Sequence, residues 1–163
     1  MGLTASAAGW FLLAAVPFGL FSIYSDLSRM KIPNLATDGL AASYIILGFI
    51  ALPFDLYLWG FAHYAVMLIA GIALNAARVM GAGDSKFIAA AAPYIAIADL
   101  RLILFLFPAA LLAAYVTHRA AKYSPLRRAV PHWESWQQGK RFPMGYPLGM
   151  TLILYLLIVL LTR

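Results

Sequence analysis

The chain has 163 residues, of which 64% are hydrophobic and only 11% are charged, and its mean hydropathy is +0.84. Water-soluble domains carry about 25% charged residues, so the composition excludes a globular enzyme with a polar shell and indicates a membrane protein. At about 20 residues per span, the length allows roughly six transmembrane helices and no separate soluble domain. The chain contains no cysteine, which excludes disulfides, cysteine nucleophiles and iron–sulfur clusters.

Six apolar runs, each bounded by charge, glycine or proline, follow one another along the chain. We expect an all-α fold, a single domain over 1–163, with helices over residues 8–24, 40–52, 57–77, 87–98, 102–116 and 148–161. The second and fourth runs are short, roughly 20 Å of helix against an apolar bilayer core of about 30 Å. We therefore expect their polar starts to lie at or below the headgroups, with Asp38 capping the second helix and Asp84 the fourth.

The basic residues gather in alternate links. Ten of the twelve Lys and Arg residues lie in the first, third and fifth links, and only Arg101 and Arg163 lie elsewhere. The positive-inside rule then predicts that these links are cytoplasmic and that both termini are outside. The net charge of +6 accordingly indicates contact with anionic membrane lipids and not with nucleic acid. The fifth link, residues 118–143, carries Trp133 and Trp136, and we expect an interfacial loop that covers the lipid surface or contacts substrate.

The acidic residues are few enough to be judged one by one. Asp55 and Asp99 fall in short outer turns, where a solvated turn residue or a helix cap is expected. Glu134 falls in the interfacial link, and we expect its side chain to point to water. Asp26 closely follows an apolar run and so lies in the last turn of the first helix, where the helix dipole disfavours an anion. It is therefore either one half of an ion pair with a neighbouring basic residue, Arg29 or Lys31, or a carboxyl that holds a proton for chemistry.

Asp84 lies in the string Met80-Gly-Ala-Gly-Asp-Ser-Lys86, where it is either a helix cap or a functional acid. The predicted topology puts Asp84 at the same depth and on the same face as Asp26. Two carboxyls brought together do not easily both ionise, so one can act as a base toward water and the other as an acid toward a carbonyl. The pair therefore permits aspartyl protease chemistry, although a proton relay or a cation site is equally compatible with it.

The sequence has few residues that could support other kinds of chemistry. The three histidines, His63, His118 and His132, have no metal-ligand spacing, so we expect no metal site. No serine has the surroundings of a nucleophile. We also expect no cofactor.

Three motifs occur in order. They are Asp26 with Arg29-Met-Lys-Ile-Pro-Asn34, then Met80-Gly-Ala-Gly-Asp-Ser-Lys-Phe-Ile-Ala89, and finally Phe142-Pro-Met-Gly-Tyr-Pro147. Together they resemble the type IV prepilin peptidases, which are GxGD intramembrane aspartyl proteases. The resemblance is to the short form found with tight-adherence pilus systems, and it extends over essentially the whole chain.

The resemblance implies that Asp26 and Asp84 are the catalytic pair in a protein of the bacterial inner (cytoplasmic) membrane. The implied substrate is a prepilin, whose short basic leader is removed at the cytoplasmic face. It also implies supporting or substrate-positioning residues near the pair: Pro33, Asn34, Gly81, Gly83, Lys86 and Pro143.

The chain lacks the cysteine-rich insertion of the long family members, which goes with N-methylation of the new pilin terminus. We therefore expect no methyltransferase activity. The main alternative is a small proton- or cation-coupled transporter that uses Asp26 and Asp84, and a catalytically silent assembly factor is a third possibility.

Overall fold

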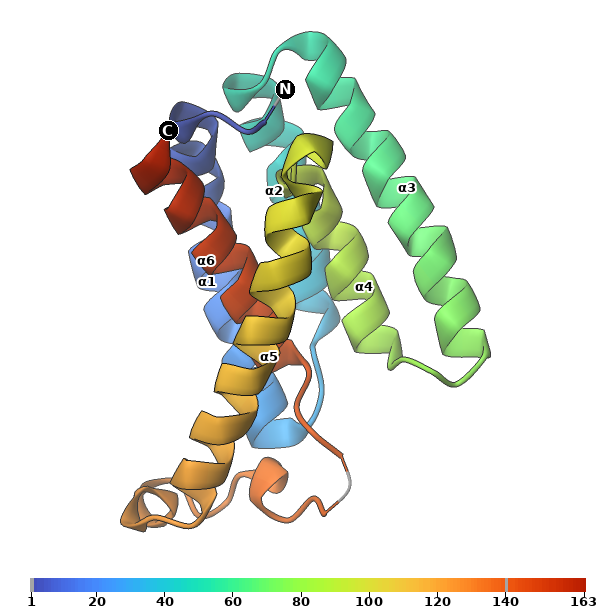
Figure 1. The fold of residues 1–163 in the computed structure, drawn as a ribbon. Helices are drawn as coiled ribbons and strands as arrows, with labels where there is room; N and C mark the ends of the chain where they lie inside the picture. Colours follow the sequence, from blue (N-terminus) through green and yellow to red (C-terminus); the bar gives the residue numbers. More distant parts are fainter. Residues whose placement is uncertain (1, 140) are drawn as a thin grey trace.

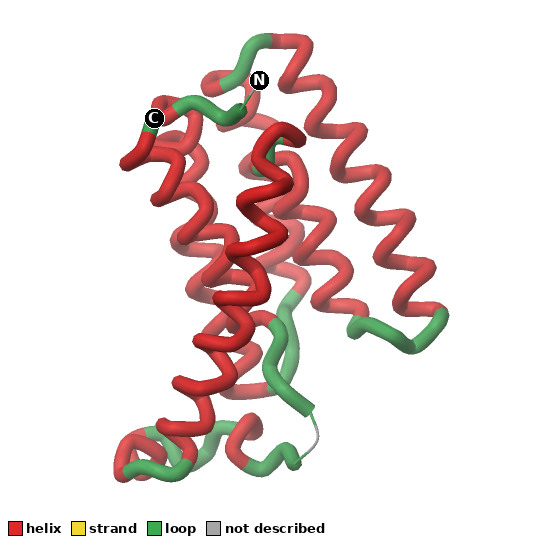
Figure 2. The backbone as a smooth tube through the Cα atoms, viewed as in Figure 1, coloured by secondary structure: helices red, strands yellow, loops and turns green. Residues whose placement is uncertain are grey.

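The computed structural model describes residues 2–139 and 141–163, and this part of the chain is helical and has no strand (Figure 2). Six α-helices follow one another (Figure 1): α1 (Ala5–Arg29), α2 (Asn34–Ala51), α3 (Phe54–Ala76), α4 (Ala82–Ala91), α5 (Leu100–Lys122) and α6 (Gly145–Thr162). Short 3₁₀ turns join α4 to α5 at Ala92–Tyr94 and Ile97–Asp99, and two more lie between α5 and α6 at Pro125–Ala129 and Glu134–Trp136. Five helices, all except α4, are long and apolar enough to cross a membrane.

The predicted short second span is wrong, because α2 begins at Asn34 and has 18 residues. Pro33 takes the N-cap position in an extended conformation, and the helix starts directly after it. Asp38 is therefore not the helix cap. It lies in the second turn, where its carboxylate accepts a 3.2 Å hydrogen bond from the hydroxyl of Thr37. The fourth helix is short as predicted, with ten residues, but the expected range 87–98 is wrong: α4 covers Ala82–Ala91, and 3₁₀ turns follow at Ala92–Tyr94 and Ile97–Asp99.

The first and last helices, α1 and α6, form the most extensive helix pair of the fold (Figure 1). A Cβ atom at Gly149 would lie 2.8 Å from the carbonyl oxygen of Gly19, so the absence of a side chain lets the two backbones come close. Small residues at such crossings promote helix association in lipid, where the hydrophobic effect does not drive helices together. The crossing brings the end of α1 to the start of α6.

An aromatic cluster holds α4 and its extension against the other helices. Phe11, Tyr44 and Tyr94 pack with ring centroids 4.7 to 5.9 Å apart. The Tyr94 hydroxyl donates to the carbonyl oxygen of Leu40 at 2.8 Å, and the Tyr44 hydroxyl donates to that of Tyr57 at 3.0 Å. Because both hydroxyls have backbone partners, the rings can be buried without leaving a polar group unsatisfied.

The links alternate between the two ends of the molecule. Both marked chain ends lie at one end, whereas the three basic links, from α1 to α2, α3 to α4 and α5 to α6, lie toward the other (Figure 1). The predicted grouping of the basic links is therefore confirmed. That this end faces the cytoplasm stays a prediction.

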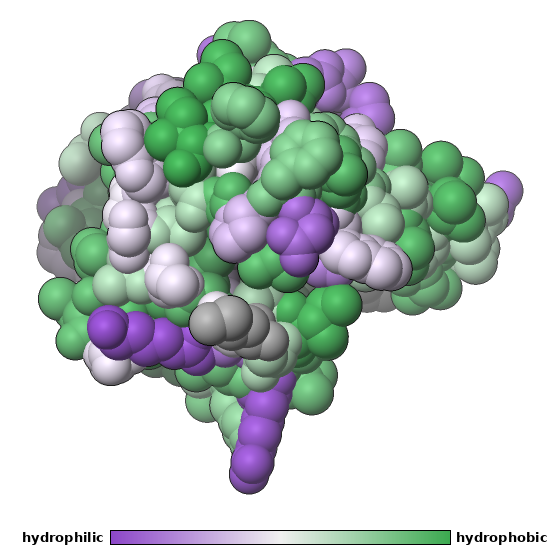
Figure 3. All heavy atoms as spheres, turned by 90° about the horizontal axis from the view of Figure 1, so that it is seen from above, coloured by the Kyte–Doolittle hydropathy of each residue, from purple (hydrophilic) through white to green (hydrophobic). Residues whose placement is uncertain are grey.

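The outer surface of the fold is apolar. α3 buries only Gly60 and Gly71, and side chains such as Trp59 and Ile69 are more than half exposed. Seen from the end that carries the chain termini, hydrophobic residues make up most of the visible surface (Figure 3). Soluble monomers rarely expose apolar patches of this extent, so the surface and the five long helices indicate a multi-pass membrane protein.

Candidate functional site

A cavity of about 920 Å³ is lined by both Asp26 and Asp84. Its other walls come from the α1–α2 turn, the α3–α4 link, the start of α4, Phe107 of α5 and the segment that leads into α6. The structure therefore brings together the two acids that the sequence singles out, at the end of the molecule that carries the basic links.

Asp26 lies in the last turn of α1 and is 4% exposed. The helix stops at Arg29 because Met30 adopts a left-handed conformation (φ 53°), with its N–H bonded to the carbonyl oxygen of Asp26. Oδ2 of Asp26 accepts a 2.6 Å hydrogen bond from the backbone N–H of Gly145, the first residue of α6. Free N–H groups at a helix start favour a negative charge. The carboxyl is thus stabilised by α6, and it forms no salt bridge with Arg29, with Lys31 or with any other described residue.

Gly145 leaves no space for a side chain. A Cβ atom there would lie 2.9 Å from Cβ of Asp26, 3.0 Å from its Oδ2 and 3.0 Å from Cγ1 of Ile32. The sequence prediction does not single out Gly145. A glycine between Pro143 and Pro147 at a helix start is nevertheless a signal for close backbone approach.

Asp84 is the third residue of α4 and so lies in its first turn, as predicted, but the N-cap is Gly81. Burial raises the pKa of the Asp84 carboxyl above its ordinary value, and a hydrogen bond from the backbone of Gly81 opposes the increase. A Cβ atom at position 81 would lie 2.8 Å from Oδ2 of Asp84, so this contact requires a glycine. A carboxyl with a raised pKa keeps its proton to higher pH, which suits it to act as an acid.

Two contacts tie the α1–α2 turn to the GxGD segment. A Cβ atom at Gly83 would lie 3.2 Å from Cβ of Ile32, so the two backbones come close. Nζ of Lys86 donates a 2.9 Å hydrogen bond to Oδ1 of Asn34. These contacts hold the first and second motifs side by side and thereby set the spacing between their aspartates.

The six predicted supporting residues divide into two groups. Gly81 and Gly83 line the cavity. The other four lie outside its lining: Pro33, Asn34, Lys86 and Pro143. Pro33 is the N-cap residue of α2, and Pro143 is fully buried just before α6. Both prolines therefore restrict the backbone of segments that line the cavity.

Three cations, Lys31, Arg78 and Arg141, line the cavity together with the two acids. None of them forms a salt bridge with either aspartate among residues 2–139 and 141–163. Within the same residues, no group of three or more His, Cys, Asp or Glu side chains is gathered to hold a metal ion. The site is therefore a cavity whose largely apolar walls carry a carboxyl pair and three cations.

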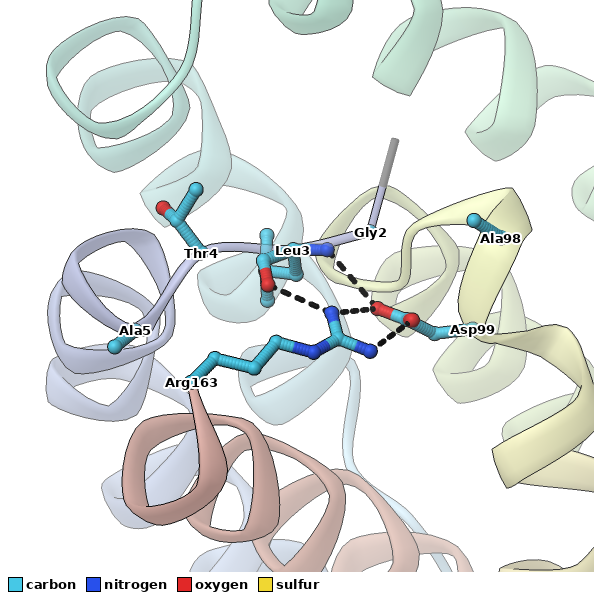
Figure 4. Close-up of a pocket in the computed structure, with 7 residues that line it drawn as sticks. All are labelled: Gly2, Leu3, Thr4, Ala5, Ala98, Asp99 and Arg163. Atoms are coloured by element: carbon cyan, nitrogen blue, oxygen red, sulfur yellow. Dashed lines mark hydrogen bonds and ion pairs between the residues drawn. The ribbon is translucent and has the colours of Figure 1, made fainter.

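Asp99 takes the N-cap position of α5, one of the two roles predicted for it, but its side chain makes no cap hydrogen bond and the predicted exposure to solvent is wrong. Asp99 is 4% exposed, and its carboxylate accepts from both terminal nitrogens of Arg163 at 2.5 and 3.0 Å (Figure 4). Oδ2 also accepts from the N–H of Leu3 at 3.0 Å and from the hydroxyl of Tyr155 at 2.9 Å. This network joins the segment before α1, the α4–α5 turn and the end of α6, at the opposite end from the cavity. Asp55 is exposed, as predicted.

The fifth link packs against the helices through an aromatic stack. His118 stacks on Trp136 with ring centroids 4.9 Å apart, and Trp136 stacks on Trp133 at 5.5 Å. Trp133 in turn meets Tyr24 of α1 edge-on at 6.2 Å, whereas Glu134 points to solvent, as predicted. The link is thus docked on the protein, and its last part supplies walls to the aspartate cavity.

The arrangement of these side chains is the basis for assigning a function. No known family profile matches the chain, and neither a curated protein nor a solved structure matches it.

Proposed function

We propose that the protein is an intramembrane aspartyl endopeptidase that removes the short basic leader of a type IV prepilin. The observation that carries this proposal is that Asp26 and Asp84, from the ends of two different helices, line one cavity. The motif resemblance supplies the substrate class. Residues from all three motifs line that cavity, including Met144 from the third.

The reaction needs one ionised and one protonated carboxyl at the same time. The ionised carboxyl takes a proton from water, the water oxygen bonds to the carbonyl carbon of the scissile peptide, and the protonated carboxyl gives its proton to the carbonyl oxygen. The carboxyl that took the proton from water then gives it to the nitrogen as the C–N bond breaks, and a hydroxyl of the tetrahedral intermediate returns a proton to the other carboxyl. One water is consumed, and the pair returns to its starting protonation.

The two acids have similar surroundings. Asp26 is buried and Asp84 is half-buried, and each accepts a hydrogen bond from a backbone N–H, Asp26 from Gly145 and Asp84 from Gly81. These surroundings support a pair that shares one proton, so that either carboxyl can serve as the base while the other donates. Because the cavity lies among the basic links, cleavage takes place at the face predicted to be cytoplasmic.

The test is co-expression of the protein with type IV prepilins, with the mass of the substrate as the readout. The wild type should shorten a prepilin by its leader, whereas Asp26→Asn and Asp84→Asn should leave it intact. Asparagine keeps an oxygen that can accept the hydrogen bond from Gly145 or Gly81, but it cannot exchange a proton. The substitutions therefore separate acid–base chemistry from structural bonding.

Asp38→Asn and Asp55→Asn serve as matched controls, because both aspartates are exposed and neither lines the cavity. Both controls should cleave as the wild type does, and immunoblots should show all variants in the membrane. A transporter would leave every prepilin intact even with the wild-type protein. Cleavage that survives in Asp26→Asn or Asp84→Asn would remove that carboxyl from the reaction.

A further inference from the structure

An apolar groove runs along α5 and meets the aspartate cavity. One part, of about 270 Å³, lies between α4, α5 and α6, and a second part, of about 410 Å³, continues along α5 toward the segment before α6. The residues of α5 that line it, between Ile103 and Tyr115, recur at helical spacing and so form one stripe on the helix. Leu104 and Leu112 on this stripe are 73% and 65% exposed, so the groove opens toward the lipid.

The groove and the cavity share walls. Ile88, Phe107 and Leu148 line both the cavity and the first part of the groove. Phe142 and Met144 line both the cavity and the second part. The cavity that holds the two carboxyls is therefore continuous with an apolar surface that faces the bilayer.

We propose that this α5 groove receives the apolar helical segment of the substrate and so presents the adjoining peptide bond to Asp26 and Asp84. The inference rests on the proposed function and adds the path by which the substrate binds. A substrate held in the bilayer by an apolar segment must approach from the lipid side, and the groove joins that side to the carboxyl pair. A cavity with two carboxyls and three cations that continues into an apolar groove matches a chain whose cleavage site borders its membrane segment.

The dimensions of the groove fit a helix. From Ile103 to Tyr115 the stripe extends over about 18 Å at 1.5 Å per residue, which accommodates about three turns of a bound helix.

The chain has no cysteine, which makes disulfide cross-linking a clean test. Leu104→Cys and Phe105→Cys form a matched pair, because the two side chains are neighbours and are 73% and 70% exposed, but only Leu104 lines the groove. Each is combined with Asp84→Asn, so that substrate binds without being cut, and oxidised in membranes with a prepilin that carries one cysteine in its apolar segment. Leu104→Cys should cross-link at least tenfold more than Phe105→Cys. Equal yields would show that lipid, and not substrate, occupies the groove, and would overturn the inference.

A kinetic test in the active protein separates this inference from the proposed function. Leu104→Trp fills the groove and should raise KM for full prepilin at least fivefold, with little change for a soluble peptide that has only the leader and the scissile bond. Phe105→Trp should change neither. If the wild type cleaves prepilin and the two tryptophan variants behave alike, the groove inference fails alone. If the wild type cleaves no prepilin, the proposed function fails and the groove inference with it.

Discussion

The backbone N–H of Gly145 donates a 2.6 Å hydrogen bond to the carboxylate of Asp26, 119 positions earlier in the chain. The contact joins the start of α6 to the end of α1 and excludes any side chain at position 145. The position of one proposed catalytic carboxyl is thus set by a residue that has no functional group of its own.

Gly145→Ala should therefore lower the rate of prepilin cleavage by about 100-fold, because displacing a catalytic group by about 1 Å costs roughly that factor. Gly139→Ala is the matched control, since a Cβ atom at Gly139 would meet nothing within 4 Å. Cleavage rates of both purified variants, measured with their melting temperatures, check the prediction. Wild-type kinetics in Gly145→Ala would show that the contact does not orient Asp26 for the reaction.

The rate of cleavage should decline on both sides of an optimum pH. In acid both carboxyls are neutral and no base remains, whereas in alkali both are charged and no proton donor remains. Because burial raises the pKa of Asp84, the alkaline decline should begin above the ordinary range of an aspartate. Initial rates of detergent-solubilised protein, with folding verified at each pH, provide the measurement. A rate that rises with pH and never declines would contradict the shared-proton mechanism.

Asp84→Asn should abolish cleavage without lowering stability at neutral pH. A raised pKa in the folded state means that folding favours the protonated carboxyl, so this group's contribution to the free energy of unfolding falls as the pH rises through the folded-state pKa. The neutral amide of asparagine does not ionise, so the free energy of unfolding of the variant does not fall in this way. The excess stability of the variant over the wild type should therefore shrink toward acid pH. Melting temperatures of wild type and variant across pH test this. A variant less stable than wild type at neutral pH would indicate a mainly structural carboxylate.

Arg163→Ala should destabilise the fold by about 1 to 3 kcal/mol, the cost of leaving a buried charged hydrogen-bonding group without its partner. Asp99 is buried and bonded to Arg163, and the network lies far from the cavity, so the cleavage rate per folded molecule should not change. Asp55→Asn, at an exposed site in the first turn of α3, should alter stability by less than about 0.5 kcal/mol. Thermal unfolding measures both variants, and an Arg163→Ala protein as stable as wild type would refute the structural role of the pair.

Cysteine labelling can decide which way the protein faces. Asp55 is exposed in the first turn of α3 and Arg128 is exposed in the fifth link, at opposite ends of the molecule, so Asp55→Cys and Arg128→Cys report on the two sides. With basic links inside, a membrane-impermeant maleimide added to intact cells should label Asp55→Cys, and should label Arg128→Cys only after permeabilisation. The reverse pattern would place the carboxyl pair outside.

The sequence predicts the helices better than their ends. Apolar runs mark the part of a helix in the bilayer core, so the prediction stops where Thr37 and Asp38 interrupt the run, although α2 continues back to Asn34. The sequence also predicts that Asp26 and Asp84 lie together, because alternate links of a helical bundle return to the same face.

Contacts between distant segments are what the sequence does not reveal. Asp99 looks like an ordinary turn residue, since its partners Leu3, Tyr155 and Arg163 come from other parts of the chain. The contact between Gly145 and Asp26 is not predictable from the sequence for the same reason. It is made by a backbone N–H, which every residue except proline has, so the residue type does not show which side chain the N–H binds.

The bond between Gly145 and Asp26 also has a consequence for the order of events during synthesis. The ribosome makes α1 early, whereas the segment that starts at Gly145 follows the other five helices. Until α6 is inserted and has paired with α1, Asp26 lacks the donor that orients it, so a half-made chain carries both acids without an assembled pair. If the proposed cleavage is its activity, the protein becomes active only after α6 is in place.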